Sequence, residues 1–237
     1  MNVLVMQLAG PLQSWGSSAR FARRTTEMAP TKSGVIGMLA GALGYERSVD
    51  LTDLAALRFG VRIDQPGMLL RDYQTAHHFA TGASMPLSER FYLQDAVFVA
   101  AVEGERGLID RLHQALHQPT FLPYLGRRSC PPSRPINLGV HRDTTLPPVL
   151  ERERWRAAAW HQRRRAESEV ELEVVLEAAA DDSTDSLRDQ PLSFDPLYRR
   201  YALRHIHTVR VRVPNPAVRD RVTSMPHHDP MSVLRGD

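Results

Sequence analysis

The amino-acid sequence predicts an α+β fold of the ferredoxin-like (RRM-like) type, with the element order β-α-β-β-α-β. Apolar segments with strand and helix periodicity follow one another in this order. Two polar or proline-rich segments interrupt the order as insertions, and one more alternating segment adds an extra C-terminal β region. The 237 residues fit one enlarged domain or a domain with an appendage.

The first half of the chain begins with a strand and a helix. Residues 1–9 are almost continuously apolar and predict a buried strand that ends at Gly10-Pro11. Residues 31–43 carry apolar side chains at helical spacing. Thr31 is in place as the N-cap of this helix and Gly44 follows its last turn, so both ends carry the expected capping residues.

Strand and helix patterns continue through the middle of the chain. Residues 59–63 alternate apolar and charged side chains, which predicts a half-exposed strand with Arg62 and Asp64 on its outer face. Residues 97–102 predict a central strand, and residues 108–116 predict an amphipathic helix. Over residues 172–176 apolar side chains alternate with glutamates, which predicts the last strand of the β-α-β-β-α-β order.

These patterns divide the chain into four segments. Residues 1–71 and 96–180 form the core, which contains a long proline-rich loop over 121–150. Residues 72–95 are polar and weakly periodic and predict an inserted hairpin. Residues 181–237 form a C-terminal extension, in which Val209, Val211 and Val213 alternate with arginines in a strand that has one apolar and one cationic face.

Composition excludes several classes of protein. Hydrophobic residues make up 42% and charged residues 24%, which is typical of folded domains in solution. No run approaches the roughly 18 apolar residues of a membrane-spanning helix, so we expect a cytoplasmic protein that makes no contact with a membrane. Cys130 is the single cysteine, which excludes an internal disulfide and sites built from several cysteines.

Charge is distributed unevenly along the chain. The net charge is only +3, and Lys32 is the only lysine, so nearly all cations are arginines. Nine acids lie between residues 167 and 189 beside one arginine, whereas residues 197–237 hold eight arginines and three acids. A basic region of this kind is typical of proteins that bind a phosphate backbone. The acidic stretch is equally able to dock a basic neighbouring subunit.

The start of the helix at 31–43 is a candidate phosphate site. The segment 26–33 ends in Lys-Ser, but Thr26 and Thr31 stand where a phosphate-binding loop requires glycine, so we exclude nucleotide hydrolysis. Free backbone amides, two hydroxyls and Lys32 remain at the helix terminus. The alternative is a capped helix with a solvated lysine.

Four glycines of the same helix, Gly34, Gly37, Gly41 and Gly44, recur at intervals of three and four residues and form a stripe along one face. Glycine inside a helix is unfavourable by about 1 kcal/mol relative to alanine, which indicates close approach of another backbone. A sheet beneath the helix and a bound strand above it are both possible partners, and we expect the sheet.

Two loops combine arginine with aromatic or glycine residues. This composition is typical of a surface that binds single-stranded nucleic acid, although a lone tryptophan is more often part of the core. The first loop contains Gln13, Trp15 and Gly16, followed by Arg20, Arg23 and Arg24. The second contains Arg127, Arg128 and Ser129 beside prolines.

Catalytic candidates are few. The histidines that come in pairs or close together are His77, His78, His205, His207, His227 and His228. Adjacent histidines point in different directions, and neither they nor Cys130 match the spacing of a metal site or a nucleophile with its base. We expect no catalytic residue, no metal and no cofactor.

Four motifs occur together in one order: LAGPLQSWG at 8–16, PTKSGVIGML at 30–39, LRDYQT at 70–75 and YLGRRSCP at 124–131. In this combination the chain resembles the CasD family, a subunit of type I-E CRISPR Cascade complexes, over about residues 1–135. Residues 191–196 add a further element of similar character.

The resemblance implies a non-catalytic protein with an RRM-like palm, formed by the core, and a thumb, formed by the hairpin. Such a subunit grips the 5′ handle of the CRISPR RNA and caps the filament of backbone subunits. Its implied partners are the CRISPR RNA, the Cascade backbone subunit, the large PAM-recognising subunit and, indirectly, target DNA. The implied RNA-binding residues are Gln13, Trp15, Gly16, Arg20, Arg23, Arg24, Thr31, Lys32, Ser33, Gly34, Tyr73, Arg90, Arg127, Arg128 and Ser129.

Two alternatives stay open. The first is a metal-independent endoribonuclease, since a type I-C relative of this family processes CRISPR RNA, although its tyrosine, lysine and histidine constellation finds no matching motif here. The second is a purely architectural subunit that contacts only proteins. A nucleic-acid binder predicts a loss of salt dependence when arginines are removed, and an architectural subunit does not.

Overall fold

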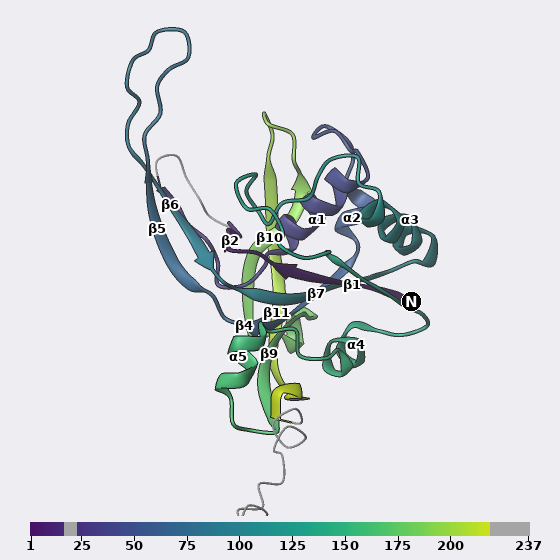
Figure 1. The fold of residues 1–237 in the computed structure, drawn as a ribbon. Coiled ribbons are helices and arrows are strands. Elements are labelled where there is room, and N and C mark those ends of the chain that lie inside the picture. Colours follow the sequence, from purple (N-terminus) through teal and green to yellow (C-terminus); the bar gives the residue numbers. More distant parts are fainter. Residues whose placement is uncertain (17–22, 219–237) are drawn as a thin grey trace, which may run out of the picture.

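The structure is a computed structural model, and it describes residues 1–16 and 23–218. It is a mixed α/β fold around a seven-stranded antiparallel sheet with the strand order β10-β11-β9-β4-β7-β1-β8 (Figure 1). The strands of this sheet are β1 (Asn2–Ala9), β4 (Arg58–Gln65), β7 (Val97–Gly104), β8 (Asn137–His141), β9 (Glu169–Glu177), β10 (Asp185–Ser193) and β11 (Arg200–Pro214). In the described ranges, no helix is long and apolar enough to cross a membrane.

Both faces of the sheet are covered, because alternate side chains of the central strands enter two different cores. Leu4, Met6 and Leu8 of β1 pack into the larger core, beneath α1 (Lys32–Ala42) and α3 (Arg106–His117). Val3 and Val5 enter the second core on the opposite face. Leu146, Val149 and Leu150 of α4 (Leu146–Arg152) complete that core. Figure 1 shows α1 and α3 above the strands and α4 below them.

The predicted ends of α1 are confirmed. The Thr31 hydroxyl accepts a hydrogen bond from the Gly34 amide at 3.3 Å, which satisfies one of the free amides of the first turn. Gly44 has a φ of +79°, the left-handed conformation that terminates helices. Two further helices are short, α2 (Thr52–Ala55) and α5 (Ala159–Arg164).

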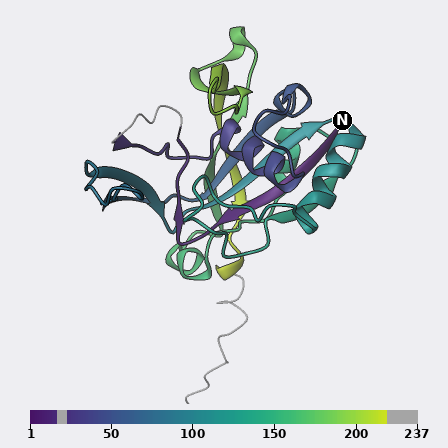
Figure 2. The same ribbon diagram turned by 90° about the horizontal axis from the view of Figure 1, so that it is seen from above.

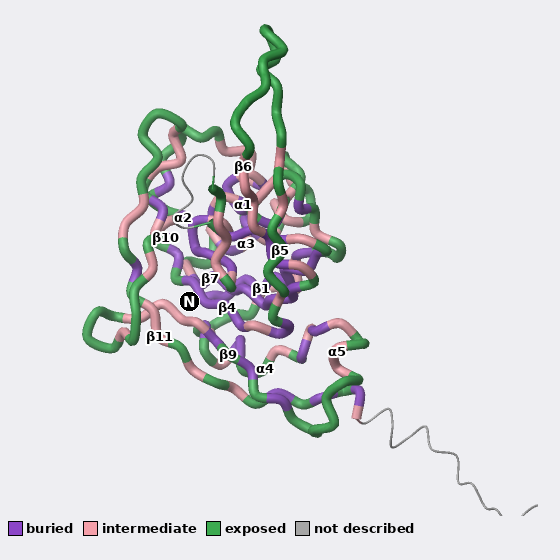
Figure 3. Tube along the Cα trace, turned by 90° about the vertical axis from the view of Figure 1, so that its left-hand side faces the viewer, coloured by how far each residue is buried: buried purple, intermediate pink, exposed green. Residues whose placement is uncertain are grey.

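A smaller sheet contains β2 (Leu12–Gln13), β3 (Arg23–Arg24), β5 (Met68–Gln74) and β6 (Ser88–Gln94). The predicted hairpin at 72–95 corresponds to β5 and β6, which pair from Met68 and Gln94 to Gln74 and Ser88. It begins four residues earlier than expected and projects from the edge of the molecule opposite α3 (Figure 2). Its outer part, residues 75–87, is exposed throughout (Figure 3).

Two strands differ from the predicted order. The proline-rich segment 121–150 contains β8, which pairs with β1, and the beginning of α4. Residues 172–176 lie in β9, as predicted, but β9 pairs with β4 and β11 and does not follow α3 directly. The short, glycine-containing β8 carries no alternation strong enough to predict a strand. The C-terminal strands β10 and β11 extend the main sheet.

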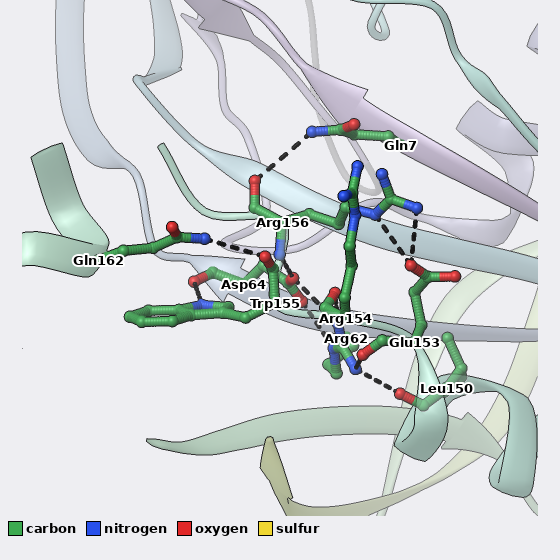
Figure 4. A network of polar contacts seen from close by, with 9 residues as sticks. All are labelled: Gln7, Arg62, Asp64, Leu150, Glu153, Arg154, Trp155, Arg156 and Gln162. Carbon is green, nitrogen blue, oxygen red and sulfur yellow. Dashed lines mark hydrogen bonds and ion pairs between the residues drawn. The ribbon is translucent and has the colours of Figure 1, made fainter. Parts of the chain in front are cut away.

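The prediction that Arg62 and Asp64 face solvent is wrong. Both side chains are fully buried and form an ion pair, in which the Arg62 Nε donates to Asp64 Oδ1 at 2.7 Å. Figure 4 shows that the segment after α4 covers this face of β4 and surrounds the pair with its own backbone groups. The alternating charges of β4 therefore lie on a second covered face of the sheet. The prediction was wrong because it took charged side chains to indicate a face exposed to solvent.

Candidate nucleic-acid interface

A groove of about 980 Å³ lies along the outer side of α1, and we call it the α1 groove. Four segments that are distant in the sequence meet there. The groove is lined by α1 itself, by Ser14, Trp15, Gly16, Arg24 and Thr25 of the first loop, by residues of the 121–131 loop, and by Phe194, Arg199 and Tyr201 near the C-terminal end.

The glycine stripe of α1 faces this groove, so the expectation that it packs on the sheet is wrong. A side chain at Gly34 would meet the Trp15 ring at 2.8 Å, and one at Gly37 would meet the Phe194 ring at 3.6 Å. Gly41 has open space above it, with no atom of the described residues within 4 Å. The missing side chains therefore create the depth of the groove, while the apolar residues on the other side of α1 fill the core.

The 121–131 loop is fixed against the first loop by a close backbone approach. The Ser14 amide donates to the Leu125 carbonyl at 3.1 Å, and Gly126 follows with a φ of +86°. A Cβ atom at Gly126 would collide with the Ser14 carbonyl oxygen, so only glycine fits. This contact sets the position of the two arginines that come next.

Arg127 is anchored at the edge of the groove. One terminal nitrogen donates to the Arg24 carbonyl at 2.9 Å, and the guanidinium lies over the Tyr92 ring at 4.6 Å from its centroid. The other terminal nitrogen, Nη1, is buried and has no hydrogen-bond partner among the described residues. A fixed arginine with an unused donor is suited to binding an anion such as a phosphate oxygen.

Charge in the α1 groove is predominantly positive. Its charged lining residues are Arg24, Arg47, Arg127, Arg128 and Arg199 against Glu46. In a recess with walls of low dielectric constant, five cations and one anion produce a local potential that attracts a polyanion.

Lys32 is not the exposed cation that we expected at the start of α1. Its ammonium is buried and bound to both carboxylate oxygens of Glu177, at 3.0 and 3.1 Å. Burial lowers the pKa of the Lys32 ammonium, and Glu177 opposes this effect. Its backbone amide donates to Asp189 at 2.7 Å, and Arg204 pairs with the same carboxylate. Lys32 therefore connects α1 to β9 and β10, and it is not among the residues that line the α1 groove.

Gln13 and Trp15 are also buried. The Gln13 side chain donates to the carbonyls of Leu8 and Ala96 and accepts a hydrogen bond from the Trp15 ring nitrogen at 3.0 Å. The Trp15 ring is fully buried and packs on Gly34, so it supports the groove from below and offers no free face for stacking.

The remaining predicted residues lie around the groove or on the hairpin. Gly16, Arg24, Thr31, Ser33, Gly34, Arg127 and Arg128 line the groove, and Ser129 is exposed beside it. Arg23 pairs loosely with Glu89 of β6, and Tyr73 is half-exposed beneath the Arg71 guanidinium. The Nε of Arg90 on β6 is buried and without a partner among the described residues. Arg20, His227 and His228 lie outside the described residues.

Sequence reasoning missed several groove residues. Arg47, Phe121, Leu122, Arg199 and Tyr201 all line it. The sequence Tyr-Arg-Arg-Tyr at 198–201 has the same alternation of aromatic and arginine residues that drew attention to the first loop, so it was a usable signal. Phe121 and Leu122 have no such pattern.

Groups for catalysis are scattered or blocked in the described part of the chain. Cys130 is fully buried, and burial raises the pKa of its thiol, which disfavours the nucleophilic thiolate. His77 and His78 lie on the exposed hairpin, while His205 and His207 lie on β11. No group of three or more potential metal ligands forms among residues 1–16 and 23–218.

The known proteins that this chain resembles are described as CRISPR or Cas proteins. The chain is 35% identical over 162 residues to "CRISPR system Cascade subunit CasD" of Escherichia coli (strain K12), covering 59% of this chain and 71% of the relative. A solved structure described as "Crystal structure of Cas protein" is 35% identical, with a TM-score of 0.70 over 91% of this chain and 99% of that one.

A second solved structure, described as "CRISPR RNA-guided surveillance complex", is 32% identical, with a TM-score of 0.73 over 98% of this chain and 97% of that one. Residues 3–207 match the family described as CRISPR-associated protein (Cas_Cas5). The resemblance to CasD that the four motifs carry is thereby confirmed, and the chain belongs to the Cas5 family of CRISPR-associated proteins.

Proposed function

We propose that this chain is a non-catalytic CRISPR RNA-binding subunit of a type I-E Cascade surveillance complex. Its α1 groove and its β5–β6 hairpin grip the 5′ handle of the RNA, and the subunit caps the filament of backbone subunits beside the large PAM-recognising subunit. Target DNA is an indirect partner. Membership of the Cas5 family and the similarity to a Cascade subunit and to a surveillance complex over nearly the whole chain support this function.

The observation that carries the proposal is the state of Arg127. Its guanidinium is fixed by Arg24 and Tyr92 at the edge of a positively charged groove, and it keeps one buried donor unused among the described residues. A buried donor without a hydrogen-bond partner lowers the stability of the fold, and an RNA phosphate oxygen would accept a hydrogen bond from it. Arg24, Thr31 and Ser33 lie along the same groove and add further donors for the backbone.

The proposal includes a division of the chain into a palm and a thumb. We assign the palm to β1, α1, β4, β7, α3 and β8, and the thumb to the β5–β6 hairpin. The neighbouring order β8-β1-β7-β4, with every pair antiparallel, supports a ferredoxin-like palm. The exposed hairpin with its arginines and Tyr73 supports the role of a thumb that contacts RNA.

We propose that the chain is non-catalytic because of where its candidate catalytic groups lie and how they are bound. A metal-independent ribonuclease needs a general base and acid near the scissile phosphate. Lys32 is held by Glu177 and Cys130 is buried. Of the candidate histidines, His77 and His78 lie on the hairpin and His205 and His207 on β11, and none of these four lines the α1 groove.

The test is a binding titration of the full chain with a 5′-labelled CRISPR repeat RNA across a salt series. We expect the double variant R127Q/R128Q to bind more weakly and to reduce the slope of log K against log salt by about 1.4, since each lost phosphate contact on a single strand removes about 0.7. The matched control is R106Q/R142Q, which removes two arginines that pair with Asp110 on α3, away from the groove.

Other outcomes contradict the proposal. If R127Q/R128Q impairs assembly with partner subunits but leaves RNA affinity and salt slope unchanged, the subunit is architectural. Site-specific cleavage of the labelled RNA that persists in EDTA supports the endoribonuclease and excludes the non-catalytic function.

A further inference from the structure

A second basic surface lies on α5, which is separate from the α1 groove. Arg163 and Arg164 of α5 and Arg165 directly after it are exposed, and Trp160 of α5 is 45% exposed. Within residues 1–16 and 23–218, no carboxylate forms an ion pair with Arg164 or Arg165. We call Trp160, Arg164 and Arg165 the α5 patch. Figure 1 shows α5 in the lower part of the molecule beside β9, whereas α1, which lines the α1 groove, lies in the upper part.

The aromatic part of the patch is held in a fixed orientation. His161 lies edge-on between the buried Trp155 and the exposed Trp160, with ring centroids 5.8 and 5.5 Å apart. The Arg164 guanidinium lies 5.4 Å from the Trp160 ring centroid. Burial lowers the pKa of His161, and the nearby charges of Arg165 and Arg164 lower it further. The patch therefore concentrates positive charge beside an exposed indole.

Helix α5 buries none of its own residues, so its position depends on buried polar groups of other segments. Before the helix, the Arg62 guanidinium donates to the carbonyls of Leu150, Glu153 and Arg154 at 2.6 to 2.8 Å. Asp64 accepts the Arg156 amide, and its carbonyl accepts the Trp155 ring nitrogen at 2.7 Å. Figure 4 shows this network, with Gln162 of α5 donating to the Trp155 carbonyl at its outer end.

The other end of α5 is held in the same way. The amide group of Asn215, which is buried, donates to the carbonyls of Gln162, Arg165 and Glu167 at 3.1 to 3.3 Å. A single buried side chain thus fixes the turn that carries Arg164 and Arg165. Two separate buried anchors hold an exposed six-residue helix, which is the arrangement expected of a binding surface on a rigid scaffold.

We propose that the α5 patch is a second nucleic-acid-binding surface, which takes a single strand by stacking a base on Trp160 and pairing its phosphates with Arg164 and Arg165. The indole beside arginines matches the chemistry of single-strand binding, in which aromatic faces stack on bases and cations follow the backbone. An acidic protein would use the cations but would not require an exposed indole. The choice of a nucleic acid also rests on the proposed function.

The test uses the full chain with its α1 groove saturated by unlabelled repeat RNA, so that binding at the groove is measured first and separately. The probes are a labelled RNA of about 20 nucleotides without repeat sequence and the DNA of the same sequence. We expect R164Q/R165Q to reduce the salt slope for the probe by about 1.4 and W160A to weaken probe binding roughly tenfold. Repeat-RNA binding is expected to stay unchanged in both variants.

Tryptophan fluorescence gives a second readout, because Trp15 and Trp155 are buried and Trp160 is the exposed indole. The probe is expected to quench the fluorescence of the wild-type chain, and this quenching should disappear in W160F. A loss in the RNA arm or in the DNA arm supports the patch and identifies which strand it takes.

Three results overturn the proposal: unchanged probe binding in R164Q/R165Q, an equal loss in the control R106Q/R142Q, or lost assembly with partner proteins without any loss of probe binding. Thermal melting confirms that each variant is folded. Failure to bind repeat RNA at the first step would contradict the proposed function instead, so the two failures are distinguishable.

Discussion

At the scale of single residues, buried ion pairs decide what the charged side chains do. Lys32 and Arg62 both belong to patterns that suggest exposure, a helix terminus and an alternating strand, and both are buried beside a carboxylate. Burying a charge is unfavourable unless it is paired and hydrogen-bonded. Each pair holds together segments that are distant in the chain, so these cations stabilise the site without contacting a ligand.

The substitution K32M tests this structural role. Loss of the ammonium leaves Glu177 unpaired, and we expect the free energy of unfolding to fall by about 3 kcal/mol, the low end of the range for breaking a buried ion pair. The double variant K32M/E177Q should recover most of this loss, because both charges are gone and the new carboxamide oxygen at position 177 can still accept the Phe59 amide. Urea denaturation of both variants provides the measurement. A K32M chain of full stability with a reduced RNA salt slope would show instead that Lys32 contacts phosphate.

Gly126 provides a second test at this scale. In G126A the new methyl group would collide with the Ser14 carbonyl, so the 121–131 loop must move and Arg127 with it. The control G82A has a φ of +67° and open space around it, so it suffers only the left-handed backbone penalty of about 1–2 kcal/mol. We expect G126A to lose roughly twice as much stability as G82A and also to lose RNA affinity, measured by thermal melting and by the same titration. Equal losses in both variants would contradict this account of the loop.

At the scale of elements, the hairpin is the part most separable from the core. Residues 75–87 are exposed throughout, and Phe79 at the tip is completely exposed. Because Gln74 and Ser88 are paired, an Asn-Gly turn can replace residues 75–87 and close the hairpin between them. We expect an unchanged melting temperature and weaker binding to repeat RNA or weaker assembly into the complex. Unimpaired binding and assembly would exclude the outer hairpin from the proposed thumb function.

The pairing of β9 with β11 accounts for much of the uneven charge along the sequence. Arg210 and Arg212 of β11 lie opposite Glu173 and Glu171 of β9 in the sheet register, and Arg210 also reaches Glu171 at 3.2 Å. Cross-strand pairs of opposite charge stabilise a sheet modestly. The acidic stretch and the arginine-rich strand therefore meet within the molecule, which the sequence alone does not reveal.

At the scale of the whole molecule, local signals predict the elements and fail for the contacts between them. Thr31 and Gly44 define α1 because helix caps depend on a few neighbouring residues. The role of Trp15 and the depth above Gly41 depend on segments that approach from far along the chain, and so does the burial of Arg62. The α1 groove was predictable as a set of loops with arginines and glycines, and Tyr-Arg-Arg-Tyr at 198–201 marked a further candidate, but the placement of Phe194 and Tyr201 against α1 was not predictable.

The bond between the Lys32 amide and Asp189 spans 157 positions of the sequence, and it has a consequence for the order of folding. The first turn of α1 gains this partner, and the groove gains its wall at Tyr201, only after the chain has been synthesised past residues 189 and 201. Contacts of such long range form slowly, because the intervening chain must be ordered first. A nascent chain on the ribosome therefore cannot complete this site before residue 201 has left the ribosome, which delays its commitment to a partner until then.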